Sequence, residues 1–330
     1  MIGCLPPKEG LRLYMARIDP HLTSGCEVCL DTSDAHLDIL RSVQHEFLRR
    51  LLGVHGRSIL AVLFTETGII PLNYRRVTEA LGYLGYVLGL SPSHIASDAY
   101  LDSLALAGCG FSGWVSDLKI VMESLPIPVE LRASDLIESA VPDLCKRLEV
   151  ACEKWLNGET EKMSDRLPLL QHRLDLNKNS LFVHKAMKFR LYLHVPIPAH
   201  RKALTRLMLS SHTLSVEILR YKERWRLRVP RDCRLCRFCR LGVENEWHAT
   251  IQCTEPRLTA LRFAFFTDLY SLQPDFPREW TSAESCLRSL VQSSDFEVVQ
   301  RVARYVYEVL SIYSASPRFR MAEYLYHALE

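Results

Sequence analysis

The chain has 330 residues, of which 48% are hydrophobic and 24% are charged, as is typical of a globular protein with two or three domains. No run of eighteen apolar residues occurs and the N-terminus has no signal-peptide pattern, so we expect neither a membrane span nor secretion. The eleven cysteines are an odd number, which argues against a disulfide framework and indicates reduced thiols in an intracellular compartment.

Helical periodicity dominates the N-terminal half. Apolar residues that recur about every 3.6 positions over residues 37–51 predict a helix, with Ser33 or Asp34 as its N-cap and Gly53 as its end. A second helix is expected to begin near Pro71, because proline is favoured in the first turn. Its apolar side consists of Val77, Leu81, Leu84 and Leu88.

Three more helices are expected before a domain boundary. Two short ones should lie at 93–106 and 112–125, and a longer one should begin at Pro142. The segment that follows is polar and rich in turn-forming residues, which indicates a connection between domains. The predicted division is a domain at 1–156, a linker at 157–184 and a second domain at 185–330.

The second domain is also predicted to be helical, so the expected fold class is mainly α. A basic helical segment at 185–228 should be interrupted by the prolines of VPIPAH. Thr281 and Glu284 are interpreted as a capping box. Apolar periodicity predicts helices around 258–269 and 299–313. The best strand signal in the chain is SLFVH, at 180–184.

Positive charge is concentrated in one stretch. Residues 185–240 contain fifteen Lys or Arg and three Asp or Glu, a local net charge of +12. The other 274 residues therefore carry −9, because the whole chain carries +3. Nine of the basic residues lie between Arg220 and Arg240. A block of this kind typically contacts phosphate groups; the alternative is a solvated charged surface.

The basic stretch leads into a cysteine cluster, CRLCRFCRLGVENEWHATIQC, at residues 233–253. Cys236-x2-Cys239, then eight residues, then His248-x4-Cys253 matches the spacing of a tetrahedral zinc site with thiolate and imidazole ligands. One turn can present the first two thiolates, and one helical turn can bring His248 and Cys253 to the same face. Four protein ligands predict one structural zinc ion and no catalytic one.

Other interpretations of the cysteines remain open at this stage. Cys233-x2-Cys236 is a competing pair that would leave Cys239 spare. The cysteines could also be reduced thiols without a metal, whereas a redox dithiol lacks the usual strand–helix context. The second CxxC motif, Cys26-x2-Cys29, is interpreted as a pair of core cysteines.

Together with the run RKALTRLMLSSHTLSVEILRYKERWR, the cysteine cluster resembles the C-terminal region of LINE-type (non-LTR) retrotransposon reverse transcriptases. That family carries a CCHC zinc finger with an acidic patch before the histidine, which Glu244 and Glu246 match. RIDPHLTSGCEV and LRSVQHEFLRRLLGVHGRSILAVLFTETGIIPLNYRR are similar to the thumb and post-thumb region of its fungal-like members. The resemblance covers roughly 8–100 and 195–260, and it implies a thumb-like helical bundle followed by a helical domain with a small zinc finger.

The chain departs from that family in the catalytic parts. A reverse transcriptase palm needs paired aspartates to hold two magnesium ions, and no two consecutive aspartates occur here. Endonuclease motifs are also absent, since Pro274-Asp275 matches only a fragment of one. We therefore expect a non-catalytic fragment with no enzyme activity and no small-molecule substrate.

The resemblance implies that the finger and its basic approach bind RNA or DNA, in the nucleus if the protein acts with its parent element. Alternating arginines would track phosphates and not read bases. Phe238 and Trp247 would either stack on unpaired bases or pack beneath the finger. Arg234, Arg237 and Arg240 would face phosphate, lower the pKa values of the cysteine thiols, or both. The expected nucleic-acid contacts are Arg220, Lys222, Arg224, Arg226, Arg228, Arg234, Arg237, Phe238, Arg240 and Trp247.

The competing function is a structural or protein-interaction remnant of a retroelement that binds no specific nucleic acid. Loss of affinity with rising salt separates the two functions, because phosphate contacts release counterions.

Overall fold

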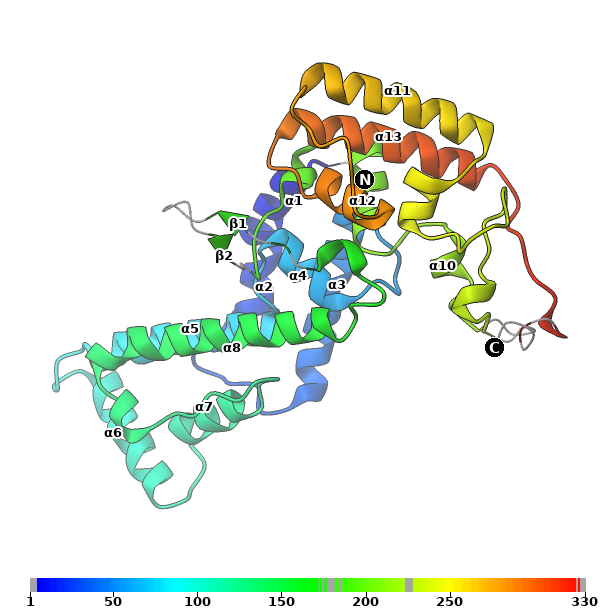
Figure 1. Cartoon of the computed structure of the whole chain (residues 1–330). Helices are drawn as coiled ribbons and strands as arrows, with labels where there is room; N and C mark the ends of the chain where they lie inside the picture. The colour runs from blue at the N-terminus through cyan, green and yellow to red at the C-terminus, as the bar shows by residue number, and fades with distance from the viewer. Residues whose placement is uncertain are drawn as a thin grey trace.

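The structure is a computed structural model, and it describes residues 5–171, 173, 175–176, 182–183, 186–222, 228–324 and 326. These residues are mainly helical, which confirms the predicted fold class. Among them, no helix has both the length and the apolar character needed to cross a membrane. Figure 1 shows two long helices, α5 and α8, running side by side, with α11 and α13 paired at the opposite end of the molecule.

The two helices predicted in the first part of the chain are present, whereas α1, α2 and α4 were not predicted. The helix α3 begins after Ser33 and ends at Gly53, whose φ of +69° is the left-handed conformation that favours glycine. Pro71 is the N-cap of α5. The elements of this part are α1 (Pro7–Leu13), the π-helical turn η2 (Tyr14–Ile18), α2 (Asp19–Thr23), α3 (Asp34–Leu52), α4 (Leu60–Thr67) and α5 (Leu72–Leu88).

The middle of the chain forms a helical hairpin and a long returning helix. Pro142 lies in the first turn of α8, which continues to Glu161 and so enters the segment predicted as a linker. The strand expected in SLFVH is present in the described residues as β2, paired antiparallel with β1. The elements are α6 (Ile95–Gly108), α7 (Trp114–Glu123), η3 (Ala133–Asp135), η4 (Glu138–Ala140), α8 (Val141–Glu161), η5 (Pro168–Leu170), β1 (Asp175–Leu176) and β2 (Phe182–Val183).

One local expectation for the C-terminal half is confirmed and one is wrong. The helical path is interrupted within VPIPAH, because the turn η6 ends at His194 and α9 begins at Pro198, where the first turn needs no backbone N–H from proline. The capping box before α12 is formed by Ser282 and Ser285, one residue away from the predicted pair. The elements are η6 (Leu191–His194), α9 (Pro198–Met208), α10 (Ser215–Ile218), η7 (Arg231–Cys233), η8 (His248–Gln252), α11 (Pro256–Leu272), α12 (Ala283–Val291) and α13 (Phe296–Ser314).

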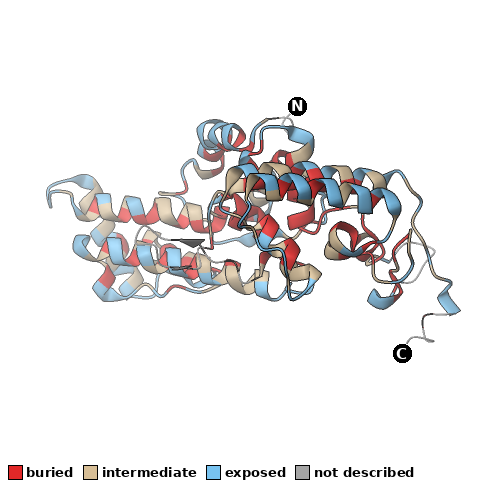
Figure 2. Cartoon of the chain, turned by 45° about the horizontal axis from the view of Figure 1, so that its top comes forward, coloured by how far each residue is buried: buried red, intermediate tan, exposed pale blue. Residues whose placement is uncertain are grey.

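One apolar core connects these parts. Buried side chains form a continuous cluster from Leu11 in α1 to Tyr313 in α13, and Figure 2 shows the buried residues on the facing sides of the helices. The helix α13 packs against both α9 and α11. The guanidinium of Arg206 in α9 donates a hydrogen bond of 2.7 Å to the carbonyl of Gly53 at the end of α3. Residues of the two predicted domains therefore share one interior.

Candidate metal centre and basic surface

A tight turn positions the first two cysteines of the cluster. Leu235 and Val243 form an antiparallel bridge, and the Cys236 N–H donates a hydrogen bond of 2.8 Å to the carbonyl of Gly242. A Cβ atom on Gly242 would lie 3.3 Å from Nδ1 of His248, so glycine lets the imidazole approach the turn. This is the chain reversal that the motif requires between its two halves.

A single π-helical turn positions the other two ligands. His248 and Cys253 lie at the start and just past the end of η8, and the Cys253 N–H donates a hydrogen bond of 2.8 Å to the His248 carbonyl. The wider π turn places residues five positions apart above each other. Asn245 caps the turn through a hydrogen bond of 2.8 Å from the His248 N–H to its Oδ1.

The four predicted ligand atoms converge on one point. Sγ of Cys236 lies 3.7 Å from Sγ of Cys253, and Sγ of Cys239 lies 3.2 Å from Nε2 of His248. All four atoms lie within 4.8 Å of one another. Bonds of about 2.0–2.3 Å from a tetrahedral ion give ligand separations of about 3.3–3.8 Å. The group could therefore hold a metal ion after the widest pair closes by about 1 Å.

The interior around the thiols favours one thiolate in the cluster. The pKa of the Cys236 thiol is lowered to about 3, first because the Cys253 thiol donates a hydrogen bond to it. The pKa of the Cys253 thiol is raised by the same interaction. The Tyr313 hydroxyl lies 3.5 Å from Sγ of Cys236, and burial raises its pKa, so it stays protonated and can donate. Thiolates are the form of cysteine that binds metal.

A buried ion pair fixes the turn to the rest of the molecule. The carboxylate of Glu244 accepts two hydrogen bonds from the guanidinium of Arg237, at 2.6 and 3.0 Å, and one of 2.8 Å from its backbone N–H. The same carboxylate accepts 2.8 Å bonds from the N–H and hydroxyl of Ser215 in α10. Both charged side chains are almost fully buried, at 2% and 0% exposure.

Two of the arginines expected at a phosphate surface are therefore interior residues. Arg237 is occupied by Glu244, and Arg234 donates to the carbonyls of Val229 and Val216 while only 3% exposed. The structure corrects the expectation that these two side chains face phosphate. Neither appears among the largest influences on the Cys236 thiol pKa.

The two aromatic residues of the cluster pack inward. The ring of Phe238 meets that of Tyr313 edge to face, with centroids 5.0 Å apart. Both Phe238 and Trp247 are half-buried against the main core. Of their two predicted roles, the arrangement favours packing beneath the turn over an open stacking platform.

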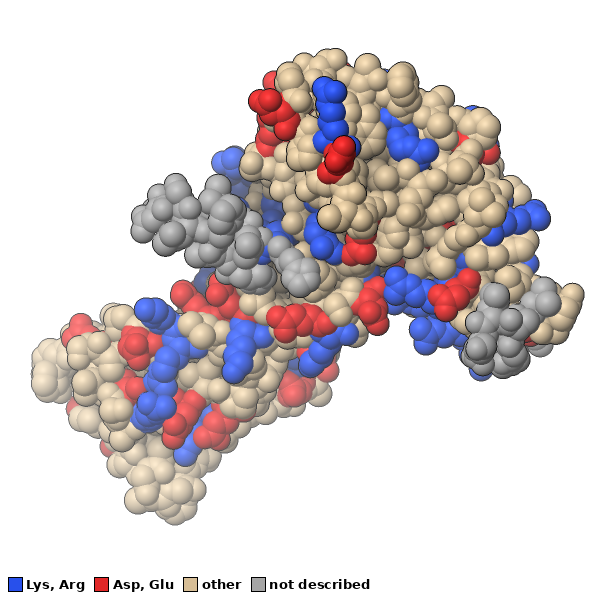
Figure 3. All heavy atoms as spheres, in the orientation of Figure 1, with Lys and Arg blue, Asp and Glu red and all other residues tan. Residues whose placement is uncertain are grey.

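The remaining basic residues divide into paired and exposed groups. Arg220 lies 3.2 Å from the carboxylate of Glu217 and is half-buried. Lys222, Arg228 and Arg240 are exposed, and Arg231 is exposed as well. Figure 3 shows Lys and Arg side chains near α10, at the lower right, and others along α8, whereas charges of both signs are scattered over α11 and α13. The predicted contacts Arg224 and Arg226 lie outside the described residues.

The sequence did not predict a buried histidine–carboxylate pair that the structure contains. Nε2 of His212 lies 2.9 Å from the carboxylate of Glu246, one of the two residues interpreted as an acidic patch. Burial by itself raises the pKa of Glu246, but the hydrogen bond and the charge of His212, a backbone hydrogen bond and the charge of Arg231 together outweigh it, so the pKa is lowered. The partners are 34 positions apart, so no local pattern pointed to them. Glu244 and Glu246 are thus both buried, the first beside Arg237 and the second beside His212, and they form no acidic surface.

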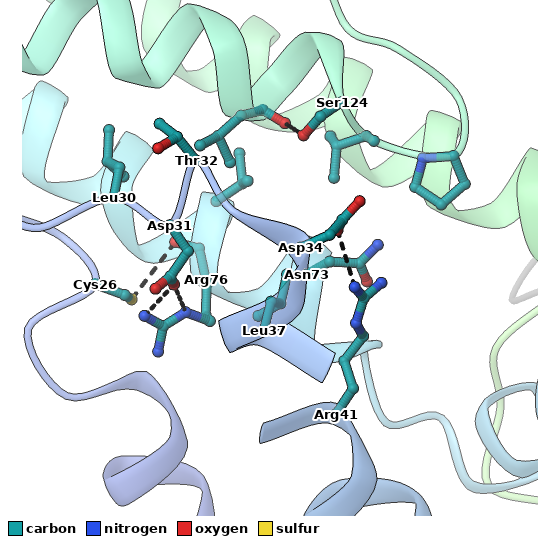
Figure 4. Close-up of a pocket in the computed structure, with 14 residues that line it drawn as sticks. Cys26, Leu30, Asp31, Thr32, Asp34, Leu37, Arg41, Asn73, Arg76 and Ser124 are labelled. Atoms are coloured by element: carbon teal, nitrogen blue, oxygen red, sulfur yellow. Dashed lines mark hydrogen bonds and ion pairs between the residues drawn. The ribbon is translucent and has the colours of Figure 1, made fainter. Parts of the chain in front are cut away.

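The competing cysteines lie elsewhere. Cys233 belongs to a separate apolar cluster with Leu219 and Val229, outside the group of four converging ligands. Cys26 is buried with its thiol 3.6 Å from the carbonyl of Arg76, whereas Cys29 is exposed. Figure 4 shows Cys26 at a cavity of about 230 Å³ between α3, α5 and the end of α7. Two ion pairs line this cavity: Asp31 with Arg76, and Asp34 with Arg41.

Comparisons with known proteins gave no match, so the site is interpreted from its own geometry. No protein-family model matches the chain, and neither the curated proteins nor the solved structures gave a match.

Proposed function

We propose that this protein is a non-catalytic nucleic-acid-binding module derived from a LINE-type reverse transcriptase, with one structural zinc ion at Cys236, Cys239, His248 and Cys253. The zinc holds the turn that presents exposed cations next to it. Zinc suits the donor set, because three thiolates and one imidazole are the ligands of structural zinc sites. Its function in the protein is to fix a surface, since four protein ligands leave no open position for a reaction.

The convergence of the four ligands is the observation that carries this proposal. They come from two separate turns of a chain segment that also bears the positive block, and their atoms lie within 4.8 Å of one another. The exposed cations Lys222, Arg228, Arg231 and Arg240 precede or flank the ligands in sequence. Exposed Lys and Arg side chains favour contacts with phosphate groups, and such contacts do not depend on the base sequence of the nucleic acid.

Salt-dependent binding tests the proposal. Each phosphate contact contributes about −0.9 to the slope of log K against log salt for duplex DNA. Four contacts therefore predict a loss of affinity of about 100-fold between 50 and 200 mM salt. Fluorescence anisotropy with a labelled duplex and a labelled single strand measures it on the zinc-loaded chain. Affinity that does not change over this range would refute phosphate binding.

A second function, protein interaction, is favoured by the surface of α6. Among its residues only Ser103 is buried, and Ile95 and Leu101 are 81% and 54% exposed. Exposed apolar groups of this kind are typical of association surfaces. Self-association or partner binding that is insensitive to salt, and that is weakened by Leu101→Ser, would support this alternative.

A further inference from the structure

A groove next to the basic segment has the chemistry of a nucleotide site. It has a volume of about 460 Å³, within the range of about 300–1,000 Å³ that ligand pockets occupy. One wall comes from the loop between α3 and α4, with Arg57, and the other from the segment around α10, with Tyr221. Arg166, after α8, lies between them.

The groove combines an aromatic ring with a cation that has no carboxylate partner among the described residues. The guanidinium of Arg57 lies 4.8 Å from the centre of the Tyr221 ring and is exposed. Arg57 forms no ion pair within the part of the chain that the structure describes. Such a pair offers flat surfaces to a base and positive charge to a phosphate.

The second arginine holds the ring in place. The guanidinium of Arg166 donates hydrogen bonds of 2.6 Å to the Tyr221 hydroxyl and 2.5 Å to the carboxylate of Glu217. The Tyr221 hydroxyl also donates a bond of 2.7 Å to Glu217. Glu217, the one carboxylate among the described residues that line the groove, is thus neutralised by Arg166 and by Arg220, which lies 3.2 Å away. These described lining residues keep a positive charge through Arg57.

We infer that this groove binds one unpaired nucleotide of a single-stranded RNA or DNA, with the base against Tyr221 and Arg57 and the flanking phosphates near Arg57 and Lys222. The inference rests on the proposed nucleic-acid binding and adds a preference for single strands over duplexes. A base within a duplex is stacked on its neighbours and cannot enter a groove, whereas an unpaired base can stack on an aromatic side chain.

The test compares variants on single-stranded and duplex probes of the same sequence, using the full zinc-loaded chain. Tyr221→Ala should weaken binding of a twelve-nucleotide single strand about 10-fold or more, and duplex binding less than about 2-fold. Tyr221→Phe should keep the single-strand affinity because the ring remains. Arg57→Ala should also weaken the single strand more than the duplex. Arg12→Ala, which removes an exposed arginine of α1, is the matched charge control.

A second measurement reports the base directly. A single strand with 2-aminopurine at one position should lose fluorescence on binding the wild-type chain, and keep it on binding Tyr221→Ala. Single-strand affinity within about 2-fold of wild type for both Tyr221→Ala and Arg57→Ala, with duplex binding intact, would overturn the groove while the proposed function stands. Absence of binding to either probe by the wild-type chain would overturn both.

Discussion

Replacing Arg237 by alanine distinguishes an interior role for this side chain from a role at the nucleic-acid surface. If Arg237 were a surface residue, its replacement would lower the affinity for phosphate and leave the fold unchanged. The structure predicts the reverse, because Arg237 and Glu244 are buried together and the guanidinium also donates to the carbonyls of Ser316, at 2.8 Å, and Thr213, at 3.3 Å.

The expected loss of unfolding free energy follows from the buried carboxylate that the substitution leaves without its ion-pair partner. Glu244 would remain buried, at 0% exposure, with only the hydrogen bonds from Ser215 and from the backbone N–H of residue 237. Removing one partner of a buried ion pair typically costs about 3–5 kcal/mol. We therefore expect Arg237→Ala to lower the free energy of unfolding by about 3–5 kcal/mol. An exposed pair such as Arg304 with Glu308, at 70% and 34% exposure, contributes about 0.2–1 kcal/mol.

Urea denaturation of the zinc-loaded chain, followed by circular dichroism, measures this difference. Arg240→Ala is the matched control, because Arg240 is exposed and lies in the same turn. It should lower nucleic-acid affinity with little change in stability. A loss below about 1 kcal/mol for Arg237→Ala, together with weaker nucleic-acid binding by the folded variant, would refute the interior role.

The other predictions concern the metal and pH. Cys239→Ser should lose stoichiometric zinc by mass spectrometry, whereas Cys233→Ser should keep one zinc per chain; the opposite pattern would favour the competing ligand pair. Tyr313→Phe removes the hydroxyl 3.5 Å from Sγ of Cys236 and should weaken zinc binding about 10-fold in a chelator competition, while an unchanged affinity would exclude that contact. The pKa of His45 is lowered to about 4, by burial first and then by neighbouring arginines. In the unfolded chain a histidine has a pKa of about 6.5, so as the pH falls the unfolded state binds a proton before the folded state does. The stability that is present above pH 6.5 is therefore lost as the pH falls towards 4. His45→Gln should flatten that loss in denaturation curves between pH 4 and 7.

Apolar periodicity, capping residues and cysteine spacing predicted the features that depend on residues close together in the sequence. The helix α3 follows its apolar period and its terminal glycine, and the four residues that could hold a metal ion are those of the preferred spacing, without Cys233 of the competing pair. The spacing is informative because two short turns suffice to bring each pair of ligands together. The shift of the capping box to Ser282 and Ser285 shows the limit of such patterns, since several serines and threonines nearby can serve equally well.

Contacts between distant segments could not be predicted in this way. The pairing of His212 with Glu246, and of Arg237 with the Ser316 carbonyl after α13, depends on how α9, α10 and α13 pack together. A single sequence shows composition and period but not which side chain a remote segment will meet. The sequence predicted a small finger within the second domain but not that Phe238 of its turn lies against Tyr313 in the main core.

The same limit applies to the positive block. Nine basic residues between positions 220 and 240 suggest a loss of affinity of about 100,000-fold between 50 and 200 mM salt if each contacted a phosphate of a duplex. Of those that the structure describes, Arg234 and Arg237 are buried and Arg220 is paired with Glu217, so their charge is already used within the fold. The exposed four predict about 100-fold. The charge that a partner meets is thus set by burial and pairing. The proposed zinc ion would hold the turn in which Arg237 is buried and Arg240 is exposed.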